Sequence, residues 1–403
     1  MRNVRALLVA LGLLTLLVAA CEGDPAEVTA EDAGDGGGED AAADEGDGGG
    51  EDAAADDGDE LIEEDDQVGI EEDAADLLGA GATFITPVML EWTRDNEPGI
   101  GVNYQSIGSG GGVEQFLGEQ VDFGSSERYL SEEELEDAQE IRGCDPLHIP
   151  DAFGSVPITF NDPDLEAALE EAGQDALVLD AEAIAGIFAA EIETWQDPAI
   201  EELNPDVDLP DTPLVAVHRS DGSGTTYIFT TYLDHEVDWW SEDYGAGDEI
   251  DWAGGTVGGN GNEGVTASVQ QQPGGVGYVS YAYAVENDMP VTEVVNADGN
   301  AVYPDLDSIS AGPNEIIDDI PDDLRYDILD VGGEGFPIVG THWVLAWECG
   351  YEDGVGESLR DFMTWVIESD EAEELARDLR YGPITGDFED RVLEEVERIN
   401  VEE

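Results

Sequence analysis

Basic residues are almost missing from this chain of 403 residues. Its 12 basic residues are all arginine and face 99 acidic residues, which gives a formal net charge of -87 at pH 7. A field of this sign repels nucleic acid and anionic membrane surfaces, and therefore excludes both as general partners. Acidic residues stay dense in 361–403, so the charge is not confined to a linker. We expect a protein adapted to high salt, because salt screens the self-repulsion of such a surface.

Lysine is absent, and histidine and cysteine, which often carry catalysis or bind metals, are scarce. The absence of lysine excludes a P-loop, which needs a Gly-Lys-Ser/Thr core. Around Ser223 the order Asp-Gly-Ser-Gly differs from the Gly-x-Ser-x-Gly of a nucleophile elbow. The four histidines lack metal-ligand spacing and form no cluster with cysteine in the sequence; they are His148, His218, His235 and His342. We therefore predict no catalytic residue, no metal site and no cofactor.

Long hydrophobic runs are limited to the start of the chain. Arg2 and Arg5 precede an apolar run over 6–20, which is shorter than the roughly 20 residues of a membrane span. The pattern predicts a secretory signal peptide over 1–20. Val18-Ala19-Ala20 stands directly before Cys21, as in a bacterial lipobox. We expect Cys21 to carry a lipid that anchors the protein on the extracytoplasmic face of the cell membrane, with no other membrane contact.

The other two cysteines are Cys144 and Cys349. Export places them in a compartment that permits disulfides. A bridge between them and two buried free thiols are both compatible with the sequence.

Residues 21–76 have almost nothing to bury. They consist mostly of Asp, Glu, Gly and Ala, and the string GDGGGEDAAAD occurs at 34–44 and again at 46–56. Low hydrophobicity with high charge is typical of disorder. We expect a disordered, self-repelling acidic tether that holds the folded part away from the membrane.

From Leu77 onward, short strand patterns alternate with amphipathic helices, which indicates an α/β architecture. Residues 102–106 alternate as in a strand. Ser131 and Glu134 form a capping box and predict a helix that runs through Arg142.

Four segments rich in glycine and hydroxyl groups predict an oxyanion site. A helix N-terminus presents unpaired N–H groups and a positive dipole end, and glycine lets an anion approach the backbone. Arg219 adds a full positive charge in a fork that suits oxyanions, and Asp221 could hold that fork in position. Any one segment alone is weak evidence, but three of the four lead into predicted helices; the segments are 79–84, 107–112, 122–127 and 218–226.

In their order along the chain, these segments resemble the signature segments of the periplasmic phosphate-binding protein of the phosphate ABC transporter. The stretches 260–264, 274–284 and 336–341 resemble that family too. The resemblance implies a two-lobed periplasmic-binding-protein fold of type II. It places lobe one at 77–154 plus 283–403 and lobe two at 155–282. It also implies inorganic phosphate as ligand and the permease subunits of an ABC importer as partners.

The resemblance implies a ligand set as well. Arg219 would supply the cation, supported by Asp221. The neutral donors would be hydroxyls and backbone N–H groups of Thr83, Phe84, Ser109, Ser223, Gly224 and Thr225.

One position departs from the family, which has Asp where this chain has Glu127. In the family this carboxylate accepts the proton of bound hydrogen phosphate. Sulfate has no proton near neutral pH, so the carboxylate would repel it. With one more methylene group, either the loop retreats or the acceptor sits differently. Alternatively, Glu127 points to solvent, and Ser126 or a water replaces it.

The sequence thus predicts an extracytoplasmic receptor that traps hydrogen phosphate between two lobes for an ABC importer, and not an enzyme. A secreted phosphatase would need a nucleophile with a base, or a metal site, and neither is seen. A lipoprotein that binds phosphate only for signalling is not excluded.

Overall fold

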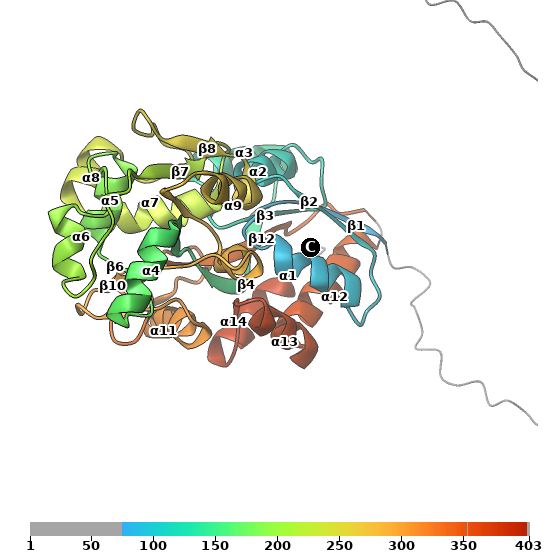
Figure 1. The fold of residues 1–403 in the computed structure, drawn as a ribbon. Helices are drawn as coiled ribbons and strands as arrows, with labels where there is room; N and C mark the ends of the chain where they lie inside the picture. The colour runs from blue at the N-terminus through green and yellow to red at the C-terminus, as the bar shows by residue number, and fades with distance from the viewer. Residues whose placement is uncertain (1–74, 353, 401–403) are drawn as a thin grey trace, which may run out of the picture. The chain divides into compact units, whose positions relative to one another are not determined.

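The computed structural model describes residues 75–352 and 354–400, apart from the side chain of residue 318 (Figure 1). The predicted signal peptide, Cys21 and all but the last two residues of the predicted tether lie outside the described residues. None of the described helices is both long and apolar enough to span a bilayer.

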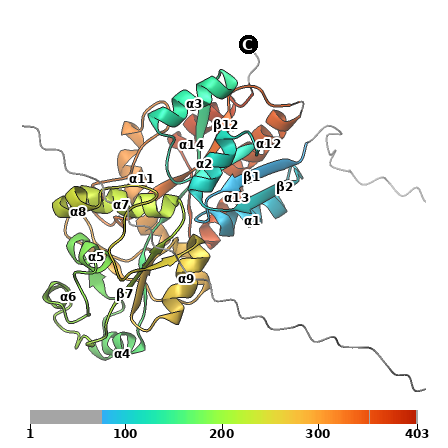
Figure 2. The ribbon, with the colours of Figure 1, turned by 90° about the horizontal axis from the view of Figure 1, so that it is seen from above.

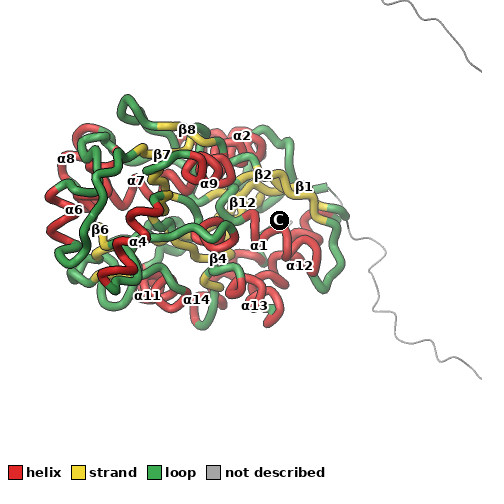
Figure 3. Tube along the Cα trace, in the orientation of Figure 1, coloured by secondary structure: helices red, strands yellow, loops and turns green. Residues whose placement is uncertain are grey.

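Helices and strands alternate along the described chain (Figure 3). Three sheets contain the strands. The six-stranded sheet has the order β13-β4-β12-β3-β1-β2, with β1 (Leu77–Gly81), β2 (Val102–Ser106), β3 (Phe123–Ser126), β4 (Pro146–Ser155), β12 (Val339–Trp347) and β13 (Gly382–Pro383). The four-stranded sheet has the order β5-β9-β7-β8, with β5 (Ile158–Asn161), β7 (Val215–Arg219), β8 (Val257–Gly259) and β9 (Gly275–Tyr278). The small sheet has the order β11-β10-β6, with β6 (Val178–Leu179), β10 (Glu293–Val295) and β11 (Ala301–Val302).

The helices gather around the two larger sheets, with α4 to α9 at one end and α1, α2, α3, α12 and α13 at the other (Figure 2). Their bounds are α1 (Thr86–Asp95), α2 (Ser109–Leu117), α3 (Glu132–Arg142), α4 (Pro163–Ala172), α5 (Ala181–Phe188), α6 (Pro198–Leu203), α7 (Gly224–Glu236), α8 (Asp238–Asp243), α9 (Gly261–Gln271), α10 (Tyr281–Glu286), α11 (Leu306–Ile316), α12 (Val355–Glu368), α13 (Asp370–Asp378) and α14 (Asp387–Val396), with a 3-10 turn at Ile317–Asp319.

Local sequence signals explain several of these elements. The predicted strand over 102–106 is confirmed as β2. The predicted capping box is also confirmed, since the Ser131 hydroxyl accepts from the Glu134 amide and the Glu134 carboxylate accepts from the Ser131 amide. The helix ends at Arg142, as predicted, and is followed by Gly143 in the left-handed conformation.

Parallel pairing brings the ends of three strands to one edge of the six-stranded sheet. β1 pairs in parallel with both β2 and β3, and Gly81 lies opposite Ser106 on one side and Ser125 on the other. The segments that follow these strands therefore emerge side by side. This carboxyl edge is where open α/β sheets usually bind ligands.

The four-stranded sheet repeats this arrangement. β7 pairs in parallel with β8, and Arg219 lies opposite Gly259 at the strand ends. The segments that lead into α7 and α9 thus start next to each other.

The expected lobe boundaries at 154/155 and 282/283 stay a prediction. β10 lies in the range expected for lobe one, yet it pairs in parallel with β6, which lies in the range expected for lobe two. The Thr292 amide also donates to the Ile158 carbonyl at the start of β5. These contacts favour a second crossing point later than residue 282.

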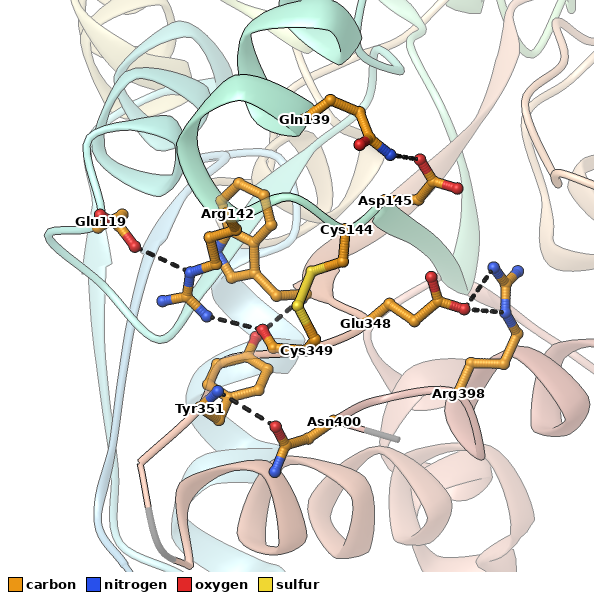
Figure 4. The surroundings of a disulfide bond; sticks show 11 residues. Glu119, Gln139, Arg142, Cys144, Asp145, Glu348, Cys349, Tyr351, Arg398 and Asn400 are labelled. Carbon is orange, nitrogen blue, oxygen red and sulfur yellow. Dashed lines mark hydrogen bonds and ion pairs between the residues drawn. A yellow bond between two sulfur atoms is a disulfide. The ribbon is translucent and has the colours of Figure 1, made fainter. Parts of the chain in front are cut away.

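Cys144 and Cys349 form a disulfide in this structure, with their Cα atoms 6.1 Å apart (Figure 4). Of the two alternatives that the sequence left open, the structure therefore contains the bridge. It joins the end of α3 to the end of β12. Arg142 lies beside it, donates to the Cys349 carbonyl over 3.1 Å and covers the ring of Trp347.

Candidate functional site

The four segments singled out in the sequence meet between the two larger sheets. The Gly110 amide donates to the Gly222 carbonyl over 3.0 Å. The Gly224 amide donates to the Ser109 hydroxyl over 2.9 Å. The predicted helices after three of the segments are confirmed as α1, α2 and α7. The remaining segment is mainly strand β3, with Glu127 directly after it.

Glycine is required where the segments cross, because the backbones approach closely. A Cβ atom on Gly110 would lie 3.0 Å from the Gly222 Cα atom. On Gly224 it would lie 2.7 Å from the Glu127 amide nitrogen. A side chain at either position would push the two sheets apart.

Arg219 is buried at the end of β7 and is held by Asp221. Its Nε atom donates to Asp221 Oδ1 over 2.9 Å, and its Nη2 atom donates to Oδ2. The Gly261 amide donates to the same carboxylate over 3.0 Å. The contact expected from the sequence is thus present, and it fixes the plane of the guanidinium group.

The hydroxyl groups of Thr83 and Thr225 are oriented by a residue that sequence reasoning did not assign to the site. Asn262 Nδ2 donates to Thr83 Oγ1 over 2.8 Å and to Thr225 Oγ1 over 3.1 Å. Because both oxygens accept from Asn262, both hydroxyl protons can point elsewhere. The only available signal was that Asn262 lies in one of the stretches that resemble the family.

Ser223 and Phe84 supply further donors. The Ser223 hydroxyl accepts from the Thr226 amide as the N-cap of α7, which leaves its own proton available. Within 75–352 and 354–400, the Phe84 amide donates to no protein acceptor. The Phe84 carbonyl accepts from the Tyr381 hydroxyl, which holds this turn in place.

Glu127 is 1% exposed and faces the segments 107–112 and 218–226. Its Oε2 atom accepts from the Ser109 hydroxyl over 2.9 Å. Burial raises the pKa of Glu127 to about 7, against the opposing influence of His342 and Ser109. The alternative in which Glu127 points to solvent is therefore wrong. Ser126 does not replace it, because its hydroxyl donates to the Arg128 carbonyl.

Two further buried residues, His342 and Asp151, lie behind Glu127 and were missed from the sequence. His342 Nδ1 lies 2.6 Å from Asp151 Oδ1. His342 Nε2 lies 3.9 Å from Glu127 Oε1. Burial opposes the charged imidazole, but the carboxylates of Asp151 and, to a smaller extent, Glu127 together outweigh burial, so the pKa of His342 is raised.

Comparison with known proteins identifies the fold and the family. Residues 54–371 match the PBP superfamily domain. The fold resembles that of a high-affinity periplasmic phosphate-binding protein, PfluDING, with a TM-score of 0.64 and 20% identity over 79% of this chain and 93% of that one. It also resembles a phosphate-binding protein from Stenotrophomonas maltophilia, with a TM-score of 0.58 and 19% identity over 80% and 94% of the two chains. The chain is thus a member of the PBP superfamily, and the predicted periplasmic-binding-protein fold is confirmed.

Closer relatives narrow this class. The chain is 38% identical to the phosphate-binding protein PstS of Xylella fastidiosa (strain Temecula1), over 76% of this chain and 80% of the relative. It is 33% identical to PstS of Pasteurella multocida, over 77% and 87% of the two chains. It is also 33% identical to PstS of Methanocaldococcus jannaschii, over 73% and 79%. The chain belongs to the PstS family of phosphate-binding proteins. It is accordingly a binding protein and not an enzyme.

Proposed function

We propose that this protein captures inorganic phosphate, as hydrogen phosphate, between its two larger sheets and delivers it to the permease subunits of an ABC importer. The observation that carries the proposal is a buried cation at the edge of one sheet, Arg219, and a buried carboxylate at the edge of the other, Glu127. Between the two edges, the Gly224 amide donates to the Ser109 hydroxyl, which in turn donates to Glu127. PstS relatives that are 33–38% identical are phosphate-binding proteins by name, which supports the same ligand.

The donors have the chemistry that a dehydrated oxyanion requires. Arg219 keeps its fork in one plane because Asp221 binds two of its nitrogens. Thr83 and Thr225 can each give a hydroxyl proton, and Phe84 can give its amide proton. Hydrogen bonds to a charged group contribute about 1.5–3 kcal/mol each, so several of them support micromolar or tighter binding despite the ordering cost.

Glu127 gives the site its selectivity in this proposal. An ionised carboxylate accepts a hydrogen bond from the proton of hydrogen phosphate. It repels sulfate, which brings no proton and leaves the buried carboxylate unpaired. The longer side chain is accommodated because Gly224 leaves room beside it; a Cβ atom there would lie within 3 Å of Glu127.

The proposed place of action is the extracytoplasmic face of the membrane, with the lipid on Cys21 and the segment 21–76 as tether. Two lobes would close on the ligand, with the first boundary at 154/155 and the second later than the expected 282/283, because β10 pairs with β6. Both parts of the proposal rest on the sequence and on family membership.

Isothermal titration with phosphate, sulfate and arsenate, at low and at high salt, tests the proposal. We expect saturable binding of phosphate and much weaker binding of sulfate in the unaltered chain. Glu127→Gln should narrow the gap between the two anions. The matched control is Glu140→Gln, an exposed carboxylate on α3 away from the site, which should leave the preference unchanged. Absence of phosphate binding at both salt concentrations would refute the proposal.

A further inference from the structure

Three buried titratable side chains lie in a row that leads from the site into the six-stranded sheet: Glu127 directly after β3, His342 on β12 and Asp151 on β4. β12 runs between β3 and β4, so His342 lies between Glu127 and Asp151. The register of β12 against β4 shifts at His342/Trp343, where Ala152 and Pro150 are the successive partners. Asp151 is the extra residue of this β-bulge. Bulges redirect side chains, and this one brings the Asp151 carboxylate to His342.

The contacts in this row are uneven. His342 Nδ1 is bound tightly to Asp151 at 2.6 Å, whereas His342 Nε2 is 3.9 Å from Glu127 Oε1. Within the described residues, His342 Nε2 and Glu127 Oε1 are both buried and have no hydrogen-bond partner. The other carboxylate oxygen of Glu127 is bound by Ser109 on the side of the ligand site. Glu127 thus accepts a hydrogen bond from the Ser109 hydroxyl on the ligand side and faces the His342 imidazole, without a hydrogen bond, on the other.

Among the charged and polar groups around Glu127, His342 has the strongest stabilising effect on the ionised carboxylate. Burial favours the neutral acid, and the charge of His342 is the strongest influence in the opposite direction, ahead of Ser109 and Arg219. Asp151 itself pushes weakly toward the neutral acid. The hydroxyls of Tyr104 and Tyr381 also face this region, but burial raises the pKa of both, so they stay neutral.

We propose that the Asp151–His342 pair is a positioning device that keeps Glu127 ionised and so sets the pH range in which the site distinguishes protonated from unprotonated oxyanions. The inference rests on the proposed function, because it takes Glu127 to face the anion. Neither residue needs to touch the ligand. Asp151 holds the imidazole protonated, and the protonated imidazole holds Glu127 as a carboxylate that can accept a proton from hydrogen phosphate.

Sulfate is the probe that reports this effect, because sulfate does not titrate near neutral pH. It is repelled by ionised Glu127 and tolerated once Glu127 is protonated. Sulfate affinity in the unaltered chain should therefore rise as pH falls through the pKa of Glu127, at about 7. An opposite charge within this distance lowers the pKa of a carboxyl group by roughly 1–3 units.

The test is a series of sulfate and phosphate titrations from about pH 6 to about pH 10, a range that covers a shift of roughly 1–3 units. His342→Gln keeps a polar side chain but cannot carry the charge, so we expect its sulfate midpoint to move up by that amount. Asp151→Asn should move the midpoint in the same direction, because the buried imidazole then loses its counter-ion. At pH 8 both variants should prefer phosphate to sulfate less strongly than the unaltered chain.

The matched control is His148→Gln. His148 is a buried histidine on β4, opposite Leu345 of β12, and it accepts from the Leu130 amide away from Glu127. Its replacement should leave the sulfate midpoint in place. If His342→Gln binds phosphate with an unchanged sulfate midpoint, the positioning role is wrong while the proposed function stands. If the unaltered chain binds no phosphate at any pH, the proposed function itself fails.

A second measurement covers the case in which the variants do not fold. The ring signals of His342 in the unaltered protein can be followed by NMR over the same pH range. We expect the imidazole to remain protonated above pH 6.5, the ordinary pKa of histidine. A ring that is already neutral at about pH 6 would overturn the proposal.

Discussion

Each of the two larger sheets contributes one buried ionic cluster to the site, and the two clusters are built differently. On the four-stranded sheet, Arg219 and Asp221 share two hydrogen bonds, and Asp221 accepts a third from Gly261. On the six-stranded sheet, Glu127 faces His342 across 3.9 Å and keeps one oxygen without a hydrogen bond in the described part of the chain. Both oxygens of the Asp221 carboxylate are paired, whereas only one oxygen of the Glu127 carboxylate is.

This difference in pairing suggests that the two clusters have different roles, one in the affinity for anions and the other in the selectivity between them. A guanidinium group that is paired on one side has a fixed charge at every physiological pH and offers its remaining N–H groups to any oxyanion. A buried carboxylate with a raised pKa changes charge close to neutrality and therefore responds to the proton on the ligand. We expect the first cluster to determine how tightly anions bind and the second to determine which anions bind.

Replacing the cation should have the largest effect. In Arg219→Gln the site loses at least two charged hydrogen bonds, and Asp221 is left without its partner. At about 1.5–3 kcal/mol per bond, phosphate affinity should fall by about 100-fold or more, and sulfate affinity should fall in parallel. Isothermal titration measures both.

The control for this change is Arg94→Gln, an exposed arginine on α1 whose side chain is 61% exposed. It lowers the positive charge equally but lies away from the site contacts, so affinity should be unchanged. If Arg219→Gln lowered the affinity for phosphate but not for sulfate, Arg219 would also determine selectivity. The assignment of affinity to one sheet and selectivity to the other would then be wrong.

The contact between Arg219 and Asp221 could be predicted from the sequence, whereas the surroundings of Glu127 could be predicted only in part. Arg219 and Asp221 are two residues apart at the end of a strand, so local spacing predicts their contact. Asp151 and His342 are 191 residues apart and meet only because β12 is inserted between β3 and β4. In the sequence, His342 was one of four scattered histidines.

The same distinction holds for the fold. The capping box of α3, the strand over 102–106 and the helices after the glycine-rich segments follow from local chemistry and were predicted. The pairing of β10 with β6 joins segments more than a hundred residues apart, and no local signal reveals it. Long-range pairing is decided by the packing of the whole domain, which local preferences do not encode.

The next largest effect concerns the stability of the half that contains Glu127. The Cys144–Cys349 bridge closes a separation of 205 residues and ties α3 to β12. Replacing both cysteines by serine should lower the free energy of unfolding by about 2–4 kcal/mol, in the usual range for a native disulfide. Chemical denaturation with and without reductant measures this. Phosphate affinity should stay unchanged, because the bridge contacts neither cluster. Equal stability of the variant and the oxidised chain would contradict this prediction.

Glu127→Gln should raise the free energy of unfolding at high pH, because the variant no longer buries an ionised carboxylate with an unpaired oxygen. Burial raises the pKa of Glu127 from 4.5 to about 7, so the folded state favours the neutral acid. The wild-type chain therefore loses stability from this group as pH rises between these two values. The variant cannot ionise, and above pH 7 it should be more stable by about 1–3 kcal/mol. Near pH 4 the difference should vanish.

Thermal or denaturant unfolding at both pH values, with Glu140→Gln as the exposed control, measures the difference. A gain of the same size at pH 4 and pH 8 would assign the effect to packing and not to charge.

The smallest effect is expected at the edge of the interface between the sheets, where Arg128 follows Glu127. Its Nε atom donates to Asp248 Oδ2 over 2.8 Å, and its two other nitrogens bind Glu134. The Asp248 carbonyl in turn accepts from the Ser223 amide at the start of α7, so Arg128 links the two halves of the site. Arg128→Gln should release phosphate a few-fold faster, because partly exposed ion pairs contribute only about 0.2–1 kcal/mol.

Stopped-flow dissociation kinetics test this link. The control is Arg325→Gln, whose partners Asp323 and Glu132 are away from Ser223 and α7. A purely electrostatic effect of losing one arginine would accelerate release equally in both variants, whereas a link across the site accelerates release in Arg128→Gln alone. The phosphate-to-sulfate preference should stay the same in both, because neither change alters Glu127 or His342. A changed preference in Arg128→Gln would mean that selectivity depends on how firmly the sheets are held together, and not on the charge of one carboxylate.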